Sequence, residues 1–487
     1  MKIILVALFL SVSISQAESI QPILKQKLKC NMTIKYKTKP KKVNTFNEFL
    51  EEGIFYGRVR FNNFLFDAKT EKDEDHYIAG LGGSLIYKSA YFNGFSFTSG
   101  LYTSQNIGEM NTHITKNYKA GKDVLSRYAV SSKNDYGITT FAENYLEYKT
   151  RKNQLKIGDF KLETMLAKSN DTKMIPNTFE GIYFKSRSIP KTTIQTAYLS
   201  KQKLRDHSNF HHLFAYGDNP NDSYGKWKEN DDGAMHKGIT VSKLKERNIK
   251  DRLFIFEAKN NSIDNVTLKI SYTTIPQLLS SVILESNYKI EVNDNFLIIP
   301  SLRYMQQFDN GAGEIAGANI KNDTTSYSNP ETLNSSLIAG RIDFVNGDSS
   351  LRLGFSSVED KGDILAPWRG LPTAGYSRAM GQTNWQANTK SYLIRADYDF
   401  SKIDTLEGLR GMMRYAINDF DDQKTGVQAD SHVLTFDLVK DVQSIPNLST
   451  KLRTAFVNGE NNIISKNNTT KKDPSYNEIR LEMNYLF

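Results

Sequence analysis

The final eleven residues of the chain, 477–487, alternate between apolar and polar side chains. The apolar positions are Ile479, Leu481, Met483, Tyr485 and Phe487. Successive side chains of a β-strand point to opposite faces, so this pattern predicts a strand with one apolar and one charged face. Its period of two does not fit an amphipathic helix, which repeats every 3.6 residues.

Residues 1–17 have the order of features expected of a signal peptide. Lys2 supplies a positive start, an apolar run covers 3–14, and Ser15-Gln16-Ala17 forms a small-residue cleavage site. The alternative is a buried apolar N-terminal helix, which the charge and the cleavage site disfavour. No later stretch approaches the ~20 apolar residues that a membrane-spanning helix needs. We therefore expect an exported protein whose final strand faces the lipid of a bacterial outer membrane.

The net charge of +9 is concentrated near the N-terminus. Residues 18–45 contain eight lysines and one acidic residue, whereas 46–487 is nearly balanced. We expect a basic periplasmic segment over 18–45, either solvated and disordered or docked on an anionic periplasmic partner, and favour the former. The charge gives no support to a nucleic-acid partner. Cys30 is the single cysteine, which excludes an internal disulfide.

About eighteen strand-like segments follow one another over residues 46–487, a number typical of barrels that keep an aqueous channel. They are 53–67, 77–88, 92–104, 141–149, 154–159, 179–187, 192–200, 253–259, 266–272, 279–290, 295–308, 335–345, 350–357, 391–400, 408–417, 433–439, 448–457 and 477–487. Residues 235–244 alternate weakly within the longest connection. We interpret them as a hairpin of that loop, because a further wall strand would break the inside-outside order.

Short and long connections alternate between these segments. Turn-forming residues such as Asn346-Gly347-Asp348 occupy the short ones, and the long ones are rich in Asn, Asp, Lys and Gly. A soluble β-sandwich has no reason to place a long loop at every other junction. The predicted fold is therefore an all-β transmembrane antiparallel barrel of about 18 strands, with periplasmic turns and extracellular loops. Barrel closure pairs every backbone group without an exposed edge.

Basic residues recur on the polar face of these segments. An arginine on the lipid face costs about 2–4 kcal/mol near the bilayer midplane, so this set is predicted to line the lumen. The residues are Arg58, Arg60, Arg341, Arg352, Arg395, Arg410, Arg414, Lys451, Arg453 and Arg480, with a weaker pattern at Arg303. Guanidinium groups attract anions and offer paired donors to carboxylates. The alternative for about half of them is pairing with lumen acids to stiffen the wall. The acids considered are Asp343, Asp397, Asp399, Glu478 and Glu482.

A wide channel needs narrowing to be selective, and an inward-folded loop is the expected device. Residues Phe160 to Thr178 are the candidate, since they carry both charge signs and a proline before the next strand. The segment 366–372, with Trp368 and two prolines, lies in another long loop. It either reaches the pore or forms an external cap.

Several motifs resemble the OprD-type outer-membrane porins. Leu155-Lys156-Ile157-Gly158, Ser169-Asn170-Asp171 and Pro176 to Gly181 are similar to the third-loop region of that family. Tyr376 to Gly381, Gly411 to Tyr415, the strand with Arg60-Phe61-Asn62-Asn63 and the closing strand are similar as well. The resemblance covers about the whole barrel. The lysine-rich segment before Phe46 and the long loop 201–252 depart from it.

The resemblance implies an often monomeric channel of 18 strands for small water-soluble solutes, typically carrying a carboxylate. By position it assigns Arg60, Arg395, Arg414, Arg453 and Arg480 to a basic ladder. It assigns Lys168, Asp171 and Lys173 to the constricting loop. The expected partners are outer-membrane lipid, lipopolysaccharide and small solutes, with a monomer or a loose oligomer.

Enzyme chemistry finds no support in the sequence. His207, His211 and His212 lie in an Asn- and Asp-rich stretch without helical pattern, and the seven histidines suggest no serine-histidine pair. We expect no catalytic residues, metal or cofactor. Two function classes remain: a porin for passive diffusion through an arginine-lined lumen, and a surface adhesin or receptor that uses the barrel to mount its long loops.

Overall fold

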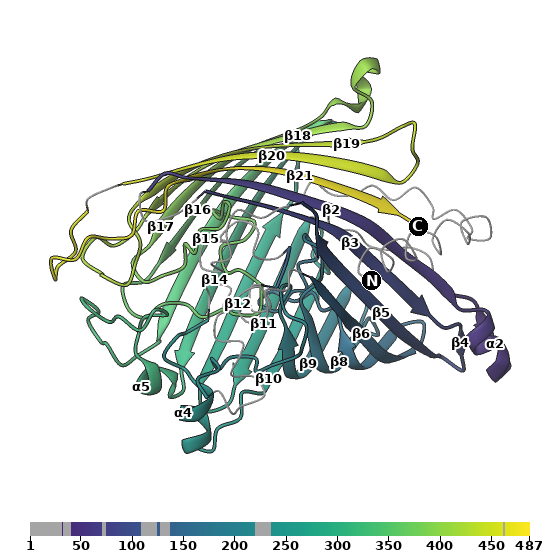
Figure 1. Cartoon of the computed structure of the whole chain (residues 1–487), viewed down its shortest axis with the longest axis horizontal. Helices are drawn as coiled ribbons and strands as arrows, with labels where there is room; N and C mark the ends of the chain where they lie inside the picture. The colour runs from purple at the N-terminus through teal and green to yellow at the C-terminus, as the bar shows by residue number, and fades with distance from the viewer. Residues whose placement is uncertain are drawn as a thin grey trace.

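The computed structural model describes residues 32, 40–70, 75–108, 124–126, 137–219, 235–460 and 463–487. Within them, eighteen long strands form one antiparallel barrel, in which each strand pairs with its successor and the last pairs with the first (Figure 1). The expected signal peptide and most of the basic segment 18–45 lie outside the described residues. Among the helices of the described residues, none is long and apolar enough to cross a bilayer.

The wall strands correspond one for one to the predicted segments. They are β2 (Ile54–Ala68), β3 (His76–Lys88), β5 (Phe95–Asn106), β6 (Ile138–Lys149), β7 (Asn153–Phe160), β8 (Thr178–Ser186), β9 (Thr192–Lys203), β10 (Leu253–Asn260), β11 (Val266–Ile275), β12 (Leu279–Tyr288), β14 (Phe296–Asp309), β15 (Ser335–Asn346), β16 (Ser349–Val358), β17 (Lys390–Asp399), β18 (Leu409–Asp419), β19 (Ser431–Asp441), β20 (Leu448–Gly459) and β21 (Tyr476–Leu486).

Short elements complete the described fold. They are β1 (Lys42–Val43), β4 (Tyr91–Phe92), β13 (Ile290–Glu291), α2 (Phe46–Glu51), α4 (Val241–Glu246), α5 (Ala312–Ala316), η3 (Phe400–Lys402) and η4 (Asp404–Leu406). The hairpin predicted over 235–244 is wrong, because this stretch leads into α4. The Thr240 hydroxyl accepts from the backbone N–H of Lys243 and caps the helix.

Alternation along each strand separates the two faces of the wall. On β16, Leu351, Leu353 and Phe355 are each about two-fifths exposed, while Arg352 between them points inward. On β2, Phe55 and Leu65 face outward and Arg58 and Arg60 are buried inside the barrel. The period-two pattern of the sequence therefore becomes an apolar outer surface and a polar lumen.

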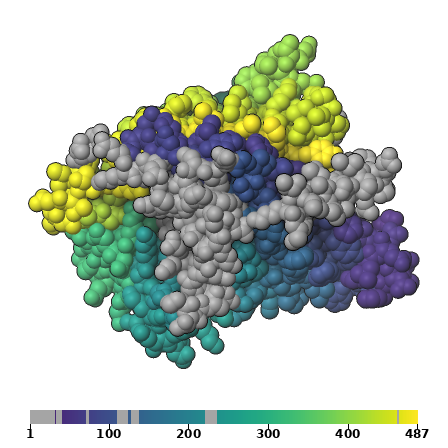
Figure 2. Space-filling view, viewed as in Figure 1, coloured from purple at the N-terminus to yellow at the C-terminus, as the bar shows by residue number. Residues whose placement is uncertain are grey.

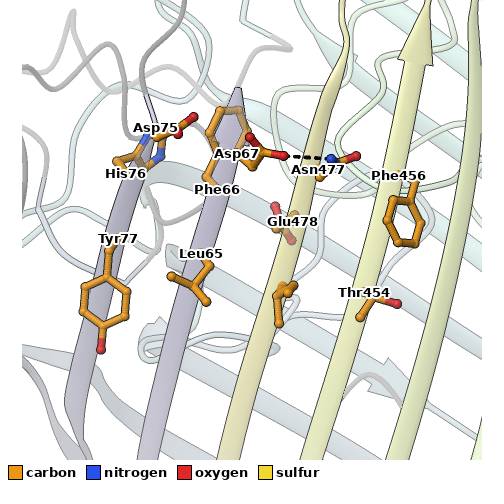
Figure 3. Close-up of a pocket in the computed structure, with 11 residues that line it drawn as sticks. Leu65, Phe66, Asp67, Asp75, His76, Tyr77, Thr454, Phe456, Asn477 and Glu478 are labelled. Atoms are coloured by element: carbon orange, nitrogen blue, oxygen red, sulfur yellow. Dashed lines mark hydrogen bonds between the residues drawn. The ribbon is translucent and has the colours of Figure 1, made fainter. Parts of the chain in front are cut away.

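The barrel closes between β2 and β21, in a register that runs from Arg58 opposite Leu486 to Ala68 opposite Tyr476. Phe487 extends the seam through two backbone hydrogen bonds with Gly57, of 3.0 and 3.2 Å. At the other end the Asn477 amide donates to the Asp67 carboxylate over 2.8 Å (Figure 3). The outer groove drawn in Figure 3 follows this seam between β3 and β20. The paired seam leaves no strand edge to lipid.

Connections alternate in length around the barrel. Tight turns such as 347–348 and 442–447 lie at one end, and the loops 161–177, 204–252, 310–334 and 359–389 start from the other. The three-residue connection 276–278 is an exception at the loop end. Figure 1 shows α4 and α5 at the loop end and α2 at the turn end, and in Figure 2 the turn with η3 and η4 projects at the top.

The largest apolar core lies where these loops meet the inner wall. Leu166, Leu213, Trp368 and Trp385 from three loops pack with inward residues of the wall such as Leu337. Each of these side chains is at most 2% exposed. Loops that bury side chains of this size inside the barrel have fixed positions, which is what a site built on them requires.

Candidate functional site in the barrel lumen

Ten basic side chains predicted to line the lumen lie on the inner faces of neighbouring strands. β2 carries Arg58 and Arg60, and the other eight come from β15 to β18, β20 and β21. Those eight are Arg341, Arg352, Arg395, Arg410, Arg414, Lys451, Arg453 and Arg480. Because β21 closes on β2, all ten belong to one side of the lumen.

Register places several of these guanidinium groups directly opposite each other. Arg395 on β17 pairs with Arg352 on β16 and with Arg414 on β18. Arg453 on β20 faces Arg480 on β21. Like charges on directly opposed residues of a sheet repel each other, so such a row needs anions between its members.

Asp437 on β19 supplies one of these anions. Its carboxylate accepts from Nε of Arg453 at 2.5 Å and lies 3.7 Å from Nη2 of Arg414 and 3.6 Å from Nζ of Lys451. Lys451 also approaches Glu482 at 4.0 Å. The Asp437 side chain is fully buried among these three cations.

Other carboxylates of the wall pair with the remaining basic residues of β15 to β21. Asp343 lies 3.2 Å from Nε of Arg341 and 2.5 Å from Nε of Arg352. Three further ion pairs join Arg395 to Asp397 at 2.6 Å, Arg410 to Asp441 at 2.9 Å, and Arg480 to Glu478. Asp399, also expected among the acids, accepts from the Ser401 N–H and caps η3.

The sequence predicted ion pairs for about half of these basic residues. In the structure each of the ten has a carboxylate within 4.0 Å. Among the described residues their partners include Asp171, Asp343, Asp397, Asp437, Asp441, Glu478 and Glu482. Several of these carboxylates are shared, since Asp437 lies beside three cations and Asp171 and Asp343 beside two each. Asp437 and Asp441 were missed from the sequence, although both stand at inward positions of the alternation in 431–441.

Loop 161–177 leaves β7, returns to β8 and contacts the distant strand β2. The Arg60 guanidinium donates from Nη1 to Oδ1 of Asp171 over 2.8 Å, and Arg58 forms a second ion pair with the same carboxylate. The Lys173 ammonium lies 4.1 Å from the centre of the Phe64 ring, within cation–π range. Three contacts hold the loop against the inner face of β2.

Charges on β2 set the ionisation of Asp171. Burial alone raises the pKa of this carboxyl, but the guanidinium groups of Arg58 and Arg60 outweigh burial and bring the pKa below its ordinary value. The arginines are 1% exposed and the carboxylate 15%. Asp171 is thus an anion that two buried cations share.

Lys168, the third residue assigned to this loop, lies where it meets loop 359–389. Its backbone N–H donates to the Trp368 carbonyl over 2.8 Å, and the Gly370 N–H donates to Leu166 over 2.8 Å. The Trp368 indole donates to the Leu213 carbonyl over 2.9 Å. Three long loops are thereby joined inside the barrel. Burial, partly offset by Glu163, lowers the pKa of Lys168.

Loop 359–389 also covers arginines of the wall. The Gly375 carbonyl accepts from Arg341 at 2.8 Å and from Arg352 at 3.0 Å. The Tyr376 ring lies against two guanidinium groups, with its centre 4.7 Å from Cζ of Arg303 and 5.1 Å from Cζ of Arg341. Within residues 366–372, the Pro372 carbonyl accepts from Nη1 of Arg303 at 2.6 Å, so this segment contacts a residue of the inner wall. Tyr376 was missed as a contact because its partners are distant in sequence.

Histidines gather in the described part of loop 204–252. The rings of His207 and His211 lie 4.5 Å apart, and burial lowers the pKa of His211 to about 3. The His212 ring is 3.3 Å from the Asp251 carboxylate. Among the described residues no group of three or more His, Cys, Asp or Glu side chains has the arrangement of a metal site.

Comparison with known proteins identifies the family. A model described as outer membrane porin, OprD family, matches residues 119–487. The chain belongs to the OprD family of outer-membrane porins. OprD-family porins are bacterial outer-membrane proteins through which small solutes pass. A search of curated protein sequences finds no match.

Solved structures of this family share the barrel. OccAB3 of Acinetobacter baumannii is 19% identical, with a TM-score of 0.67 over 89% of this chain and 99% of that one. OccK8 (OprE) of Pseudomonas aeruginosa is 12% identical, with a TM-score of 0.68 over 90% and 99%. OpdK of Pseudomonas aeruginosa, solved with vanillate, is 16% identical, with a TM-score of 0.64 over 90% and 99%. At these identities the likeness shows the fold.

Proposed function

We propose that this porin is a passive diffusion channel for small anionic solutes, in particular carboxylates. Solutes move along the basic side of the lumen formed by β15 to β2, and loop 161–177 narrows their path. The observation that carries this proposal is the sharing of carboxylates on one side of the lumen: Asp437 lies beside three cations, and Asp171 and Asp343 lie beside two each.

A guanidinium that shares its carboxylate with another cation attracts a further anion and offers it parallel N–H donors, which match the two oxygens of a carboxylate. Opposed pairs such as Arg395 and Arg414 provide adjacent donors, so a carboxylate exchanges one partner for the next as it moves. The wall carboxylates keep each contact weak, because they already occupy part of every guanidinium. Conduction requires sites that are weak enough to release the solute.

Loop 161–177 is the proposed constriction, with Lys168, Asp171 and Lys173 as its charged residues. Asp171 forms ion pairs with both Arg58 and Arg60 and fixes the loop on β2. The junction of Lys168 with Trp368 joins this loop to loop 359–389. Two loops that support each other inside the barrel keep the passage narrower than the wall alone.

A structural neighbour supports the solute class. The OpdK structure was solved with vanillate, which is an aromatic carboxylate. Aromatic rings beside arginines, such as Tyr376 beside Arg303, suit a solute that carries both a ring and an anionic group. We accordingly place monocarboxylates of benzoate size first in the solute panel.

Liposome swelling with pairs of solutes matched in size tests this proposal. The panel compares benzoate with benzamide and acetate with acetamide, each with proteoliposomes and protein-free liposomes. The expected result is faster entry of each carboxylate than of its neutral amide. Entry ranked by size alone would contradict a role for the basic side, and no entry of any solute would contradict a channel.

The receptor alternative is tested by removing residues 220–234 from the longest loop. This deletion keeps the hydrogen bond from the Trp368 indole to the Leu213 carbonyl and the one from the Phe214 N–H to Asp251. Permeation is expected to survive it. Normal folding with loss of permeation would show that this part of the loop serves the pore.

A further inference from the structure

Helix α2, just before the first wall strand, has one apolar side. Phe46, Phe49 and Leu50 are spaced three and four residues apart and share this side, whereas Asn47 and Glu51 point elsewhere. Phe46 is 65% exposed and Leu50 51% exposed. Large apolar side chains so exposed on a short helix indicate contact with something outside the described fold.

The barrel holds α2 in a fixed orientation. Thr45 and Glu48 form a capping box at its start. The Ala90 N–H donates to the Phe49 carbonyl over 3.0 Å, and the Tyr87 hydroxyl donates to the Leu50 carbonyl over 2.6 Å. These bonds fasten the helix to the end of β3 and the turn that follows it.

The apolar side of α2 continues the lipid-facing surface of the barrel. Tyr87, which bonds the helix, packs against Phe55 with its ring tilted and the ring centres 5.0 Å apart, and Phe55 is 46% exposed on the outer wall. Aromatic residues of this kind mark the interface of a barrel with the bilayer. In Figures 1 and 2, α2 lies beyond the end of β2, outside the barrel wall. This is the end of the short turns, hence the periplasmic end.

We propose that α2 is an interfacial anchor that buries Phe46 and Leu50 in the periplasmic leaflet of the outer membrane. This inference rests on the orientation of the barrel and is independent of which solutes pass. Lys41 and Lys42 stand before the helix and Glu48, Glu51 and Glu52 within or after it, so local charges nearly cancel. Insertion is therefore apolar in origin and insensitive to the charge of the lipid.

Site-directed spin labels test the depth of α2. Single cysteines are introduced as Phe46→Cys and Leu50→Cys in a Cys30→Ser background, with Asn47→Cys and Glu51→Cys as matched controls on the polar side. Each protein is placed in nanodiscs at one copy per disc. Power saturation with oxygen and with a water-soluble nickel chelate reports burial in lipid. The ratio of oxygen to nickel accessibility is expected to be several-fold higher at 46 and 50 than at 47 and 51.

Lipid composition and a second variant sharpen the result. The ratios are expected to be the same in zwitterionic and in anionic discs, and the label at 50 is expected to lose depth when Phe46→Ser is added. Equal ratios at all four positions would overturn the anchor. Labels at 46 and 50 that are immobile yet shielded from oxygen would overturn it as well, since protein would then cover this side. Depth that appears only in anionic discs would show electrostatic binding instead.

Discussion

Asp171 and Arg60 form an ion pair of 2.8 Å that joins a loop to a distant strand of the barrel wall. Asp171 belongs to the loop between β7 and β8, whereas Arg60 lies on β2, with β3, β5 and β6 between them. Arg58 binds the same carboxylate. The Asp171 carboxylate thus connects the proposed constriction to the first strand of the wall through two arginines.

Replacing Asp171 by asparagine is expected to release loop 161–177. Removing one partner of a buried ion pair costs on the order of 3 kcal/mol, because the remaining charge stays buried without compensation. Single-channel recordings should show a higher conductance with more frequent transitions between levels. Asp264→Asn is the matched control, since Asp264 is 95% exposed in a periplasmic turn. A variant indistinguishable from this control would separate Asp171 from the constriction.

The ion pair of Asp171 predicts how the pore responds to acid. Arg58 and Arg60 outweigh the effect of burial and lower the pKa of this carboxyl in the folded state. A lowered pKa means that the contact is intact at and above the ordinary aspartate value, about 3.9, and is lost as pH falls through the lower folded value. Conductance should stay constant from pH 7 to about 4 and change only below it. The Asp171→Asn channel should lack this transition; a transition above pH 4 would contradict the assignment.

Tyr376 is expected to hold loop 359–389 against the wall through its ring. Contacts between a cation and a ring contribute about 1 kcal/mol each, and Tyr376 faces both Arg303 and Arg341. Tyr376→Ala should therefore raise conductance and weaken the preference for benzoate over benzamide. Tyr376→Phe keeps the ring and should leave both properties close to those of the wild type. Similar behaviour of the two variants would assign the effect to the hydroxyl.

The wall of this barrel was predictable because its signal is local. Every second residue of a strand faces lipid, so segments such as 350–357 and 391–400 match β16 and β17 to within one residue at each end. Inward basic residues were found by the same rule, since charge on the lipid face is costly. The positions of the short turns were predictable from local residues as well. Asn447, for example, adopts a φ of +68° in the turn before β20.

The interior was less predictable because its contacts join residues far apart in the chain. Asp363 illustrates this: its carboxylate accepts from the Tyr327 hydroxyl at 2.7 Å, the Asn319 amide at 3.1 Å and the Ala387 N–H at 2.9 Å. These three donors come from two long loops, and no repeat of the sequence relates them. The hairpin expected over 235–244 failed for a related reason, since weak alternation in a loop competes with capping by Thr240.

Asp437 offers the most direct test of the link between charge and selectivity. It is buried among Arg414, Lys451 and Arg453, and Asp437→Asn adds one positive charge to the basic side without changing its size. A unit charge 10 Å from an ion changes the energy of that ion by about 0.4 kcal/mol in water. This energy corresponds to about a twofold change in the permeability of each ion. Because chloride gains and potassium loses, the permeability ratio of chloride to potassium changes about fourfold. Reversal potentials in a tenfold KCl gradient should shift toward chloride by that amount at low salt and by less at high salt.

Asp348→Asn, at a periplasmic turn where Asp348 pairs with Lys402, is the control and should leave the ratio unchanged. Heat-modifiable migration in gels verifies that both variants form the barrel, and an unchanged ratio in a correctly folded Asp437→Asn channel would show that ions pass away from the basic side.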